Sequence, residues 1–554
     1  MKFCVQFDTI IVIKEILGGN SVGKNKFASK PNSFKSKKYN ANSTNNDIVD
    51  NVADFHTHTG GMGHSADSIK VTGFSTENGV LLGKDIGDAS GILGGSHDAS
   101  GRTDQAIVAF KSLANGKTMA ITEHNTMGSI ALLLKQLNEK IDVYNEENGA
   151  NFPKYDTSRV IHRINGVNVI PGVEITCVVP GIKSEKGKEL KVHMLVYGAR
   201  FETNGMFHRL LKAKHHNDLL RDQGLFKIIE KQFGVIISEQ VIREYIIKKQ
   251  SEVPGFGQFG PSNVVDFLRE KGISLSMTYE EVRKMLKAAP EPQRLQLSIE
   301  DVIKVAHASG GICILAHPHV NLNRIALNLP DNATKDQKMN ILAIEKKKVI
   351  KKLLSFNIDG FEMVCNSANE VGNNLIRSTV KECGLDKSIL YTAGSDTHFN
   401  VGDNLSSTTK LGRTKQGIIN GDYQSKFYRE LVNMDNARQN SKLNGNDQIM
   451  YRVNVPIYSA KEIENIVSKY EGAARTYQET FAQGVTNFSD VVDIIAQSKD
   501  YGISVRDKSL TDCANYGNYI DTQYNQQIDS NNKMMYSYSS YEAITHKDSD
   551  EKAK

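Results

Sequence analysis

The sequence predicts an α/β fold in which a barrel of parallel strands gathers polar side chains on one face. Between about residues 51 and 412, short apolar runs alternate with helical patterns, as expected of successive β/α units. Several fragments that contain histidine or a carboxylate end or closely follow such runs. Because the carboxyl ends of barrel strands meet on a shared face, we expect these fragments to converge there.

The bulk composition bounds the class of protein. A chain of 554 residues with 39% hydrophobic content exceeds one ordinary domain and can build a core, although polar segments are also expected. The formal net charge of +5 permits an anionic substrate but does not require nucleic acid. Six cysteines without a C-x-x-C pair favour a reducing compartment over a disulfide framework.

Targeting signals are weak in this sequence. No apolar stretch approaches the roughly 20 residues of a membrane-spanning helix. Asp8 and Lys14 interrupt the apolar run near the N-terminus, so a secretory signal is not predicted. We therefore expect a cytoplasmic protein without membrane association, although a non-classical export signal would escape this reasoning.

Both ends of the chain differ in composition from its middle. Residues 1–50 predict a disordered basic leader, because they contain a lysine-rich stretch without acids. Residues 413–505 predict an accessory helical region, which includes an amphipathic helix that starts near Ser459. Residues 506–554 lose apolar periodicity and predict a disordered tail. The sequence does not identify protein partners for either end.

Apolar runs and helical periodicity predict the elements of the barrel region, 51–412, in order. The expected strands are Met119–Thr122, Val167–Thr176, Val192–Tyr197, Ile312–Ala316, Gly360–Val364 and Ile389–Thr392. The expected helices are Gln105–Ala114, Ile130–Leu137, Pro261–Glu270, Tyr279–Ala288, Ser298–Ala308 and Lys335–Leu354. Ser298-Ile-Glu-Asp301 resembles a capping box. Residues 60–97 are rich in glycine and serine and predict a long loop, whereas residues 200–296 predict an inserted helical cap.

The fragment Asp54-Phe-His56-Thr-His58 predicts half of a metal site. Residues i and i+2 of a strand face the same side, so both imidazoles point into one space. Neutral imidazole is the commonest metal ligand among protein side chains. Asp396 and His398 repeat this spacing after a later strand and a Gly-Ser turn.

Other candidate ligands also lie at strand ends. Glu174 ends an apolar run, and a carboxylate can bridge two cations, which favours a bi- or trinuclear centre over a lone zinc. His317 follows a strand that a proline terminates, at the lip where barrel active sites lie. His193 lies inside an apolar run, a position that by itself is more typical of a core histidine.

In this order the fragments resemble the motifs of the polymerase and histidinol phosphatase (PHP) superfamily. They are His56-Thr-His58, Glu123-His124-Asn125-Thr126, Pro171-Gly-Val-Glu174, an isolated His193, Ala316-His317-Pro318 and Gly394-Ser-Asp396-Thr-His398. The cap and the segment Pro261–Gly272 further resemble the branch that contains bacterial nucleoside-bisphosphate phosphatases and the 5′-to-3′ exoribonuclease AM. The resemblance covers roughly residues 51–410.

The resemblance implies a distorted TIM-like barrel of seven β/α units that holds two or three divalent cations, commonly manganese, iron or zinc. The implied ligands are Asp98 and eight residues of these motifs: His56, His58, His124, Glu174, His193, His317, Asp396 and His398. Glu174 would bridge two of the metals. Asp98 would take the place of the family's acidic ligand after H-x-H, and Asp67 is the second choice.

Two departures from the family pattern affect what the resemblance implies. Glu123 stands where the family has an aspartate, and the Gly-Arg-Pro-His segment of the cap reads Phe259-Gly-Pro-Ser262 here. Substrate contacts could come instead from a basic helical stretch, whose candidates are Arg209, His215, His216 and Arg221. A solvated helix face is the alternative for each of them.

The expected activity is hydrolysis of a phosphoric ester by a metal-activated hydroxide. His193 or His317 could protonate the leaving oxygen, a role that the sequence does not separate from metal ligation. The expected substrate is a small phosphomonoester such as a nucleotide or nucleoside bisphosphate, with the 5′ end of a short RNA as the alternative. The alternative from a non-enzymatic class is a binding or effector protein that retains the metal barrel only for its structure.

Overall fold

A computed structural model describes residues 52–62, 66–75, 79–83, 93–96, 99, 101–113, 116–200, 205–235, 261–288, 295–330, 332–399, 411–415, 417–443 and 456–473. The predicted basic leader and the predicted disordered tail lie outside these residues. All described residues belong to one compact unit of the chain.

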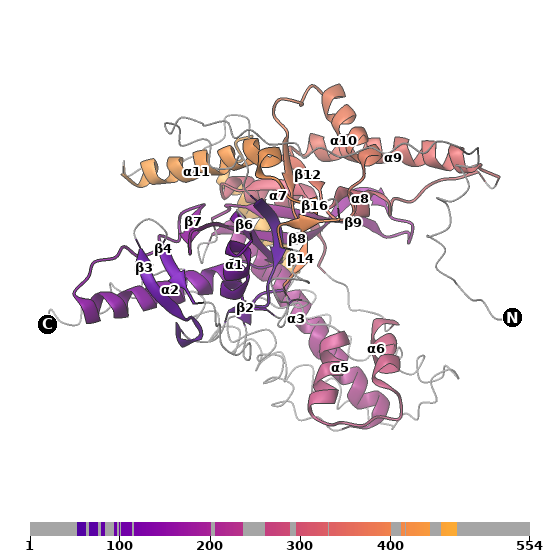
Figure 1. The fold of residues 1–554 in the computed structure, drawn as a ribbon. Helices are drawn as coiled ribbons and strands as arrows, with labels where there is room; N and C mark the ends of the chain where they lie inside the picture. The colour runs from indigo at the N-terminus through magenta and orange to yellow at the C-terminus, as the bar shows by residue number, and fades with distance from the viewer. Residues whose placement is uncertain are drawn as a thin grey trace, which may run out of the picture. The chain divides into compact units, whose positions relative to one another are not determined.

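A single curled sheet organises the fold (Figure 1). Its strands follow the order β13-β12-β11-β9-β8-β6-β1-β14. Their bounds are β1 (Val52–His58), β6 (Gly116–His124), β8 (Val167–Lys183), β9 (Glu189–Tyr197), β11 (Ile312–Leu315), β12 (Gly360–Val364), β13 (Leu390–Ala393) and β14 (Thr397–His398). Two short strands, β7 (His162–Ile164) and β10 (Leu297–Ser298), pair with β8.

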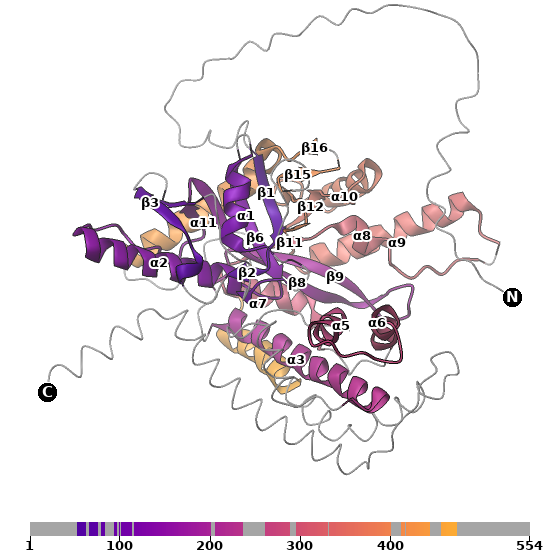
Figure 2. The same cartoon turned by 60° about the horizontal axis from the view of Figure 1, so that its bottom comes forward.

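The direction of β9 departs from the predicted parallel arrangement. β9 pairs antiparallel with both β8 and β11, whereas the other neighbours along the strand order pair parallel. The reason is local, because β8 turns directly into β9 between Lys183 and Glu189. A short hairpin connection forces antiparallel pairing, since a parallel neighbour needs a long crossover. Figure 2 shows β8 and β9 running side by side.

The two ends of the strand order approach each other, which gives the sheet its curl. β13 and β14 are separated in sequence only by Gly394, Ser395 and Asp396, although they lie at opposite ends of the order. The side chain of Gln424 joins the edges, because its Nε2 donates to the carbonyl of Ala53 in β1. Its Oε1 accepts from the N–H of Ala393 in β13. The Gln424 side chain therefore links β1 to β13, two strands that are not paired with each other in the sheet.

The predicted alternation of strands and helices, and with it the mixed α/β class, is confirmed. The helices of this part are α1 (Thr103–Lys111), α2 (Gly128–Asn148), α7 (Ile299–Ala308), α8 (Pro318–Leu322), α9 (Lys335–Ser355), α10 (Glu370–Glu382) and α11 (Ser425–Leu443). α2 runs beyond the predicted Leu137 to Asn148, and Gly149 follows it with a left-handed φ of 58° that suits a helix C-terminus. α1 packs on β6, and α7 packs on β8 and β11.

Two local predictions are wrong. Residues 60–97 contain more than loop, because β2 (Gly61–Met62) pairs with β5 (Leu93–Gly94) and β3 (Val71–Ser75) pairs with β4 (Gly79–Leu82), beside a 3-10 turn, η1 (Ala66–Ser68). Val80 and Leu82 of β4 are buried, so the β3–β4 hairpin has an apolar face. The glycine-rich composition of the segment gave no sign of it. Ser298 is the N-cap of α7, but its side chain makes no capping hydrogen bond. Its N–H donates instead to the Tyr470 hydroxyl.

The described part of the predicted cap is helical. It consists of α3 (Met206–Phe233), α5 (Pro261–Glu270) and α6 (Tyr279–Ala288). The second half of α3 forms a small apolar cluster with α5 and α6 that contains Phe226 and Phe267. The first half of α3 contributes Phe207 and Leu210 to the main core instead. α3 is therefore shared between the main core and the cap.

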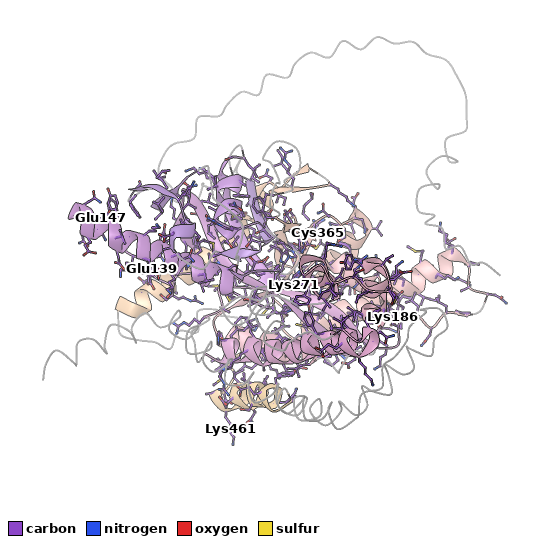
Figure 3. All side chains as sticks on the ribbon, turned by 90° about the horizontal axis from the view of Figure 1, so that it is seen from below. Glu139, Glu147, Lys186, Lys271, Cys365 and Lys461 are labelled. Atoms are coloured by element: carbon purple, nitrogen blue, oxygen red, sulfur yellow. The ribbon has the colours of Figure 1, made fainter. Side chains whose placement is uncertain are left out.

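The C-terminal helices pack against the sheet region. Phe427 of α11 makes edge-to-face contacts with Phe55 and Tyr197, whose ring centroids lie 4.9 Å and 5.0 Å from its own. Residues 460–473 form a further helix, as predicted, and bury Val467 in the main core. Its outer face carries charge, as Lys461 shows in Figure 3. Among the described residues, no helix has the length and apolarity that crossing a bilayer requires.

Candidate metal centre

The two histidines of the H-x-H fragment lie side by side at the end of β1. Both imidazoles are buried, and their Nε2 atoms are 3.1 Å apart. The register of β1 against β6 shifts between Asp54 and Thr57. Such irregularities re-aim side chains beside functional sites. The predicted shared orientation of His56 and His58 is therefore present.

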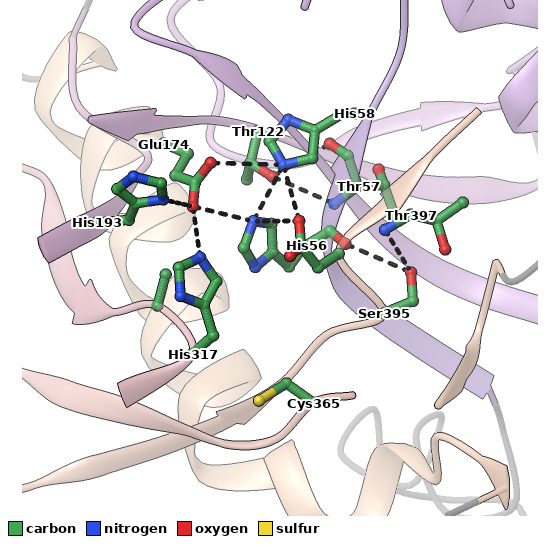
Figure 4. Close-up of polar contacts among 12 residues, drawn as sticks. His56, Thr57, His58, Thr122, Glu174, His193, His317, Cys365, Ser395 and Thr397 are labelled. Carbon is green, nitrogen blue, oxygen red and sulfur yellow. Dashed lines mark hydrogen bonds and ion pairs between the residues drawn. The ribbon is translucent and has the colours of Figure 1, made fainter. Parts of the chain in front are cut away.

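Glu174 occupies the middle of the cluster (Figure 4). Its Oε1 lies 2.8 Å from His193 Nδ1 and 3.0 Å from His317 Nε2. Its Oε2 lies 2.7 Å from His124 Nδ1 and 3.6 Å from His58 Nε2. One carboxylate thus contacts imidazoles from four separate segments of the sheet, an arrangement suited to bridging cations.

Asp396 and His398 complete the cluster from the other end of the strand order. Asp396 Oδ1 lies 3.3 Å from His58 Nε2 and 3.5 Å from His56 Nε2. His398 Nε2 lies 3.4 Å from His124 Nε2. Gly394 makes this approach possible, because a Cβ at that position would collide with the His56 side chain. The Gly-Ser-Asp turn therefore needs glycine for a steric reason.

His193 reaches the cluster although β9 runs opposite to its neighbours. It sits in the middle of β9, and its carbonyl accepts from the N–H of Ala316, just beyond the end of β11. The middle of β9 thus lies level with the C-terminal end of β11. In the sequence, His193 is an isolated histidine within an apolar run, which is a weak signal for a metal ligand. Only the strand register shows why it belongs to the site.

Two buried groups fix which nitrogen each histidine presents. His56 Nδ1 lies 3.0 Å from Glu362 Oε1, a carboxylate that only accepts, so this Nδ1 carries the proton. The Ser96 hydroxyl donates to Glu123 at 2.7 Å, so it must accept from His58 Nδ1 at 3.1 Å. In their neutral forms both histidines therefore point a lone pair from Nε2 toward the cluster.

Glu123 supports this arrangement from behind the histidines. It accepts from the Thr59 N–H, from Ser96 and from the Ser129 hydroxyl. Ser96 Oγ also accepts from the N–H of His124. Burial raises the pKa of Glu123, and these hydrogen bonds oppose that rise. Glu123 thus holds Ser96, which supports both His58 and His124.

The electrostatics of the cluster follow from burial and close charges. Burial disfavours the charged form of Glu174, but the imidazoles of His193 and His124 outweigh it and lower its pKa well below the ordinary value. Burial alone would lower the pKa of His56, yet Glu362, Asp396 and Glu174 raise it. His58 responds differently, because burial and the neighbouring His124 lower its pKa to about 3. The centre thus contains anionic oxygens beside neutral imidazole.

The donor set fits divalent cations. Three overlapping groups bring ligand atoms close together: His58, His124 and His398; His56, His58 and Glu174; and Glu174, His193 and His317. Both oxygens of the buried Glu174 carboxylate lie within 3.0 Å of an imidazole nitrogen. The Nε2 atoms of His56 and His58 face each other at 3.1 Å, so either a proton between them or a cation near both offsets the repulsion of their lone pairs. Imidazole with carboxylate suits zinc, iron and manganese.

The remaining predicted residues do not all reach this centre. Asp98 lies outside the described residues. Asp67, the second choice, is exposed and lies 3.5 Å from Lys140 Nζ, so it is not part of the cluster. Arg209 is engaged by the carboxylates of Glu464 and Glu471. His215, His216 and Arg221 belong to α3, but their side chains lie outside the described part of the chain.

Sequence reasoning missed three supporting residues of the site. Glu362 accepts from the His317 N–H at 2.7 Å as well as from His56, so it holds two of the histidines. A charged residue inside the apolar strand Gly360–Val364 was the available signal. Asp54 accepts from the N–H groups of Ser395 and Gly412 and so supports the Gly-Ser-Asp turn. Ser96 gave no sequence signal.

The sequence matches no protein-family model and no curated protein. Two solved structures share a partial likeness. A provisionally assigned metal-dependent phosphoesterase from Bifidobacterium adolescentis is 16% identical, with a TM-score of 0.36 over 61% of this chain and 92% of that one. An amidohydrolase from Chromobacterium violaceum, with bound sulfate and no metal, is 14% identical, with a TM-score of 0.31 over 57% and 86%. Likeness at this level does not assign a function to this chain.

Proposed function

We propose that this protein is a metal-dependent phosphoesterase built on a PHP-like barrel of seven β/α units. The observation that carries the proposal is the convergence on Glu174 of imidazoles from separate segments of the sheet, His124, His193 and His317. A centre with facing imidazoles and a central carboxylate is a common design for hydrolysis assisted by several cations. The proposed occupants are two or three divalent cations.

The chain's own residues have separable tasks in this proposal. His56, His58 and Asp396 would hold one cation, His193 and His317 a second, and His124 and His398 a third, with Glu174 shared among them. When bound, the cations would activate water and neutralise charge on the phosphoryl oxygens. Glu362 and Ser96 keep the imidazoles in the tautomer that ligation requires.

His193 is the better of the two candidates for protonating the leaving oxygen. Its side chain is 31% exposed, whereas that of His317 is 11% exposed. Contact between His193 Nδ1 and Glu174 orients the ring. Asp396, at 34% exposed, marks a second open part of the cluster. A small phosphomonoester, such as a nucleotide or nucleoside bisphosphate, is the proposed substrate that would enter here.

The proposal is tested by measuring bound metal and turnover together. The full-length protein is loaded with Mn²⁺, its metal content is measured by mass spectrometry, and hydrolysis of a panel of phosphoesters is assayed. We expect His56→Ala and Asp396→Ala to lower both metal content and kcat by at least about a hundredfold, because each removes a ligand. Asp98→Ala tests the predicted ligand outside the described residues.

Asp67→Ala is the matched control, since it removes an exposed aspartate from the same part of the chain without touching the cluster. It should retain metal and turnover. Full activity of His56→Ala, or a metal-loaded wild type that hydrolyses none of the phosphoesters, would contradict the proposed function.

A further inference from the structure

Asn125, which directly follows His124, has an unusual backbone conformation. Its φ is 54°, in the left-handed region that non-glycine residues rarely adopt. Asparagine tolerates this region better than most residues, but the conformation is still strained. Strain of this kind concentrates at functional sites, where surrounding contacts hold it in place. The side chain of Asn125 is also buried.

Hydrogen bonds fix the orientation of the Asn125 amide. The backbone N–H of Asn125 donates to the Glu174 carbonyl at 2.7 Å. The side-chain Oδ1 accepts from the Thr176 N–H at 3.2 Å. Because an N–H must face an oxygen, the amide cannot be turned over without losing this bond. The Nδ2 group is therefore directed away from Thr176.

The Nδ2 of Asn125 has no hydrogen-bond partner among the described residues, although it is buried. A buried donor left without an acceptor is costly, and native structures rarely retain one without a reason. An acceptor from outside the chain would satisfy it. An ordered water is the competing occupant, because a polar site of sufficient size can hold one.

The position of Asn125 places this residue beside the metal centre. His124 precedes it, and its backbone is bonded to Glu174. Thr176, which holds its side chain, is paired in register with His193 across β8 and β9. The amide therefore lies where the strands that carry three members of the cluster meet.

We propose that the Asn125 amide donates a hydrogen bond to an oxygen of the substrate's phosphoryl group and so positions it. This inference rests on the proposed phosphoesterase function and deepens it. A neutral donor held in one orientation beside a cation centre suits an anionic oxygen. Because Nδ2 is closed off from solvent in this structure, neighbouring side chains must move aside for that oxygen to reach it. The hydrogen bond from the Thr176 N–H holds the Asn125 side chain in place, and the left-handed backbone of Asn125 sets its direction.

Two substitutions separate donor loss from misfolding. Asn125→Asp retains an oxygen for Thr176 but replaces the donor with a carboxylate. Asn125→Gly removes the side chain while favouring the left-handed conformation, so the backbone is not strained further. The matched control is Asn165→Gly, because Asn165 is also buried with a φ of 52° but lies in the turn between β7 and β8.

The experiment uses the full-length Mn²⁺-loaded protein, with p-nitrophenyl phosphate as substrate and inorganic phosphate as competing ligand. We expect both Asn125 variants to lose roughly 10- to 100-fold in phosphate affinity and in kcat/KM, the size of a hydrogen bond to a charged group. Metal content should stay at the wild-type level. Asn165→Gly should leave all three quantities unchanged.

Unchanged phosphate affinity and kcat/KM in both variants, beside an active wild type, would overturn the role of Asn125 alone. Loss of bound metal in both variants would also overturn it, because Asn125 would then support the ligands and not the substrate. A wild type that neither hydrolyses the ester nor binds phosphate would instead refute the proposed function.

Discussion

Single residues decide whether the cluster can ligate a cation, because a histidine must present a lone pair and not a proton. Glu362 and Ser96 make that choice for His56 and His58 by accepting from Nδ1. Glu362 does more than this, since its second oxygen holds the backbone of His317. Outer partners of this kind affect metal affinity although they do not bind the metal themselves.

Glu362→Gln should weaken Mn²⁺ binding by about 10- to 100-fold. Both oxygens of Glu362 accept hydrogen bonds, whereas glutamine offers one acceptor and opposes the other N–H with its own donors. Calorimetric titration of the metal-free protein with Mn²⁺ measures the effect.

The matched control for this variant is Glu382→Gln, which changes an exposed glutamate that pairs with Lys347 and Lys351. It should bind Mn²⁺ like the wild type. If Glu362→Gln binds Mn²⁺ equally well, the orienting role of Glu362 is wrong.

Helices and strands determine which candidate side chains are free to act. α3 carries Arg209, which the sequence offered as a substrate contact. The structure pairs its guanidinium with Glu464 and Glu471 of the helix 460–473, at 2.7 Å and 2.6 Å. The same helix contacts α7 through Tyr470, whose hydroxyl donates to Asp301. This helix therefore holds the base of α3 against α7.

Arg209→Met should lower the free energy of unfolding by about 1 kcal/mol, the range of partly exposed ion pairs, and leave KM unchanged. Methionine retains an apolar stem and removes only the charge. Urea unfolding and steady-state kinetics of the same preparation measure the two effects.

The control is Arg429→Met, because Arg429 is exposed on α11. A double-mutant cycle with Glu464→Gln should show coupling between the two residues. A raised KM with unchanged stability would restore the substrate role that the sequence suggested for Arg209.

The whole molecule adds effects that no single element shows, among them the response of stability to acid. His162 of β7 is buried and its Nε2 has no hydrogen-bond partner among the described residues. Burial lowers its pKa to about 4, against an ordinary value of 6.5. The unfolded chain therefore takes up a proton on this side chain at a higher pH than the folded chain does.

This difference contributes stability that is fully present above about pH 6.5 and is lost as the pH falls toward about 4. At 1.36 kcal/mol per pKa unit, we expect a loss of about 2 kcal/mol between roughly pH 7.5 and pH 5. His162→Asn cannot titrate, so its free energy of unfolding should fall less over this range. Urea unfolding of both metal-free proteins at the two pH values measures the difference, and equal slopes would contradict it.

The sequence predicted much of the fold because strands and helices here follow local periodicity. Gly360–Val364, Pro261–Glu270 and Tyr279–Ala288 were predicted with their observed bounds. The hairpin within residues 60–97 was missed, since glycine and serine dominate its composition while its buried side chains are few. The direction of β9 was also missed, because an apolar run reads the same whichever way its strand points.

By itself, the sequence determined which side chains could form the centre: the imidazoles, Glu174 and Asp396 stand out by chemical type and by position at strand ends. Only the tertiary structure decided that His193 joins them, that Asp67 does not, and that Arg209 is already paired. It also decided which nitrogen each histidine presents, through Glu362 and Ser96. The physical reason is that ligand identity is a local property of the residue, whereas tautomer, orientation and proximity depend on partners that lie far away in the chain.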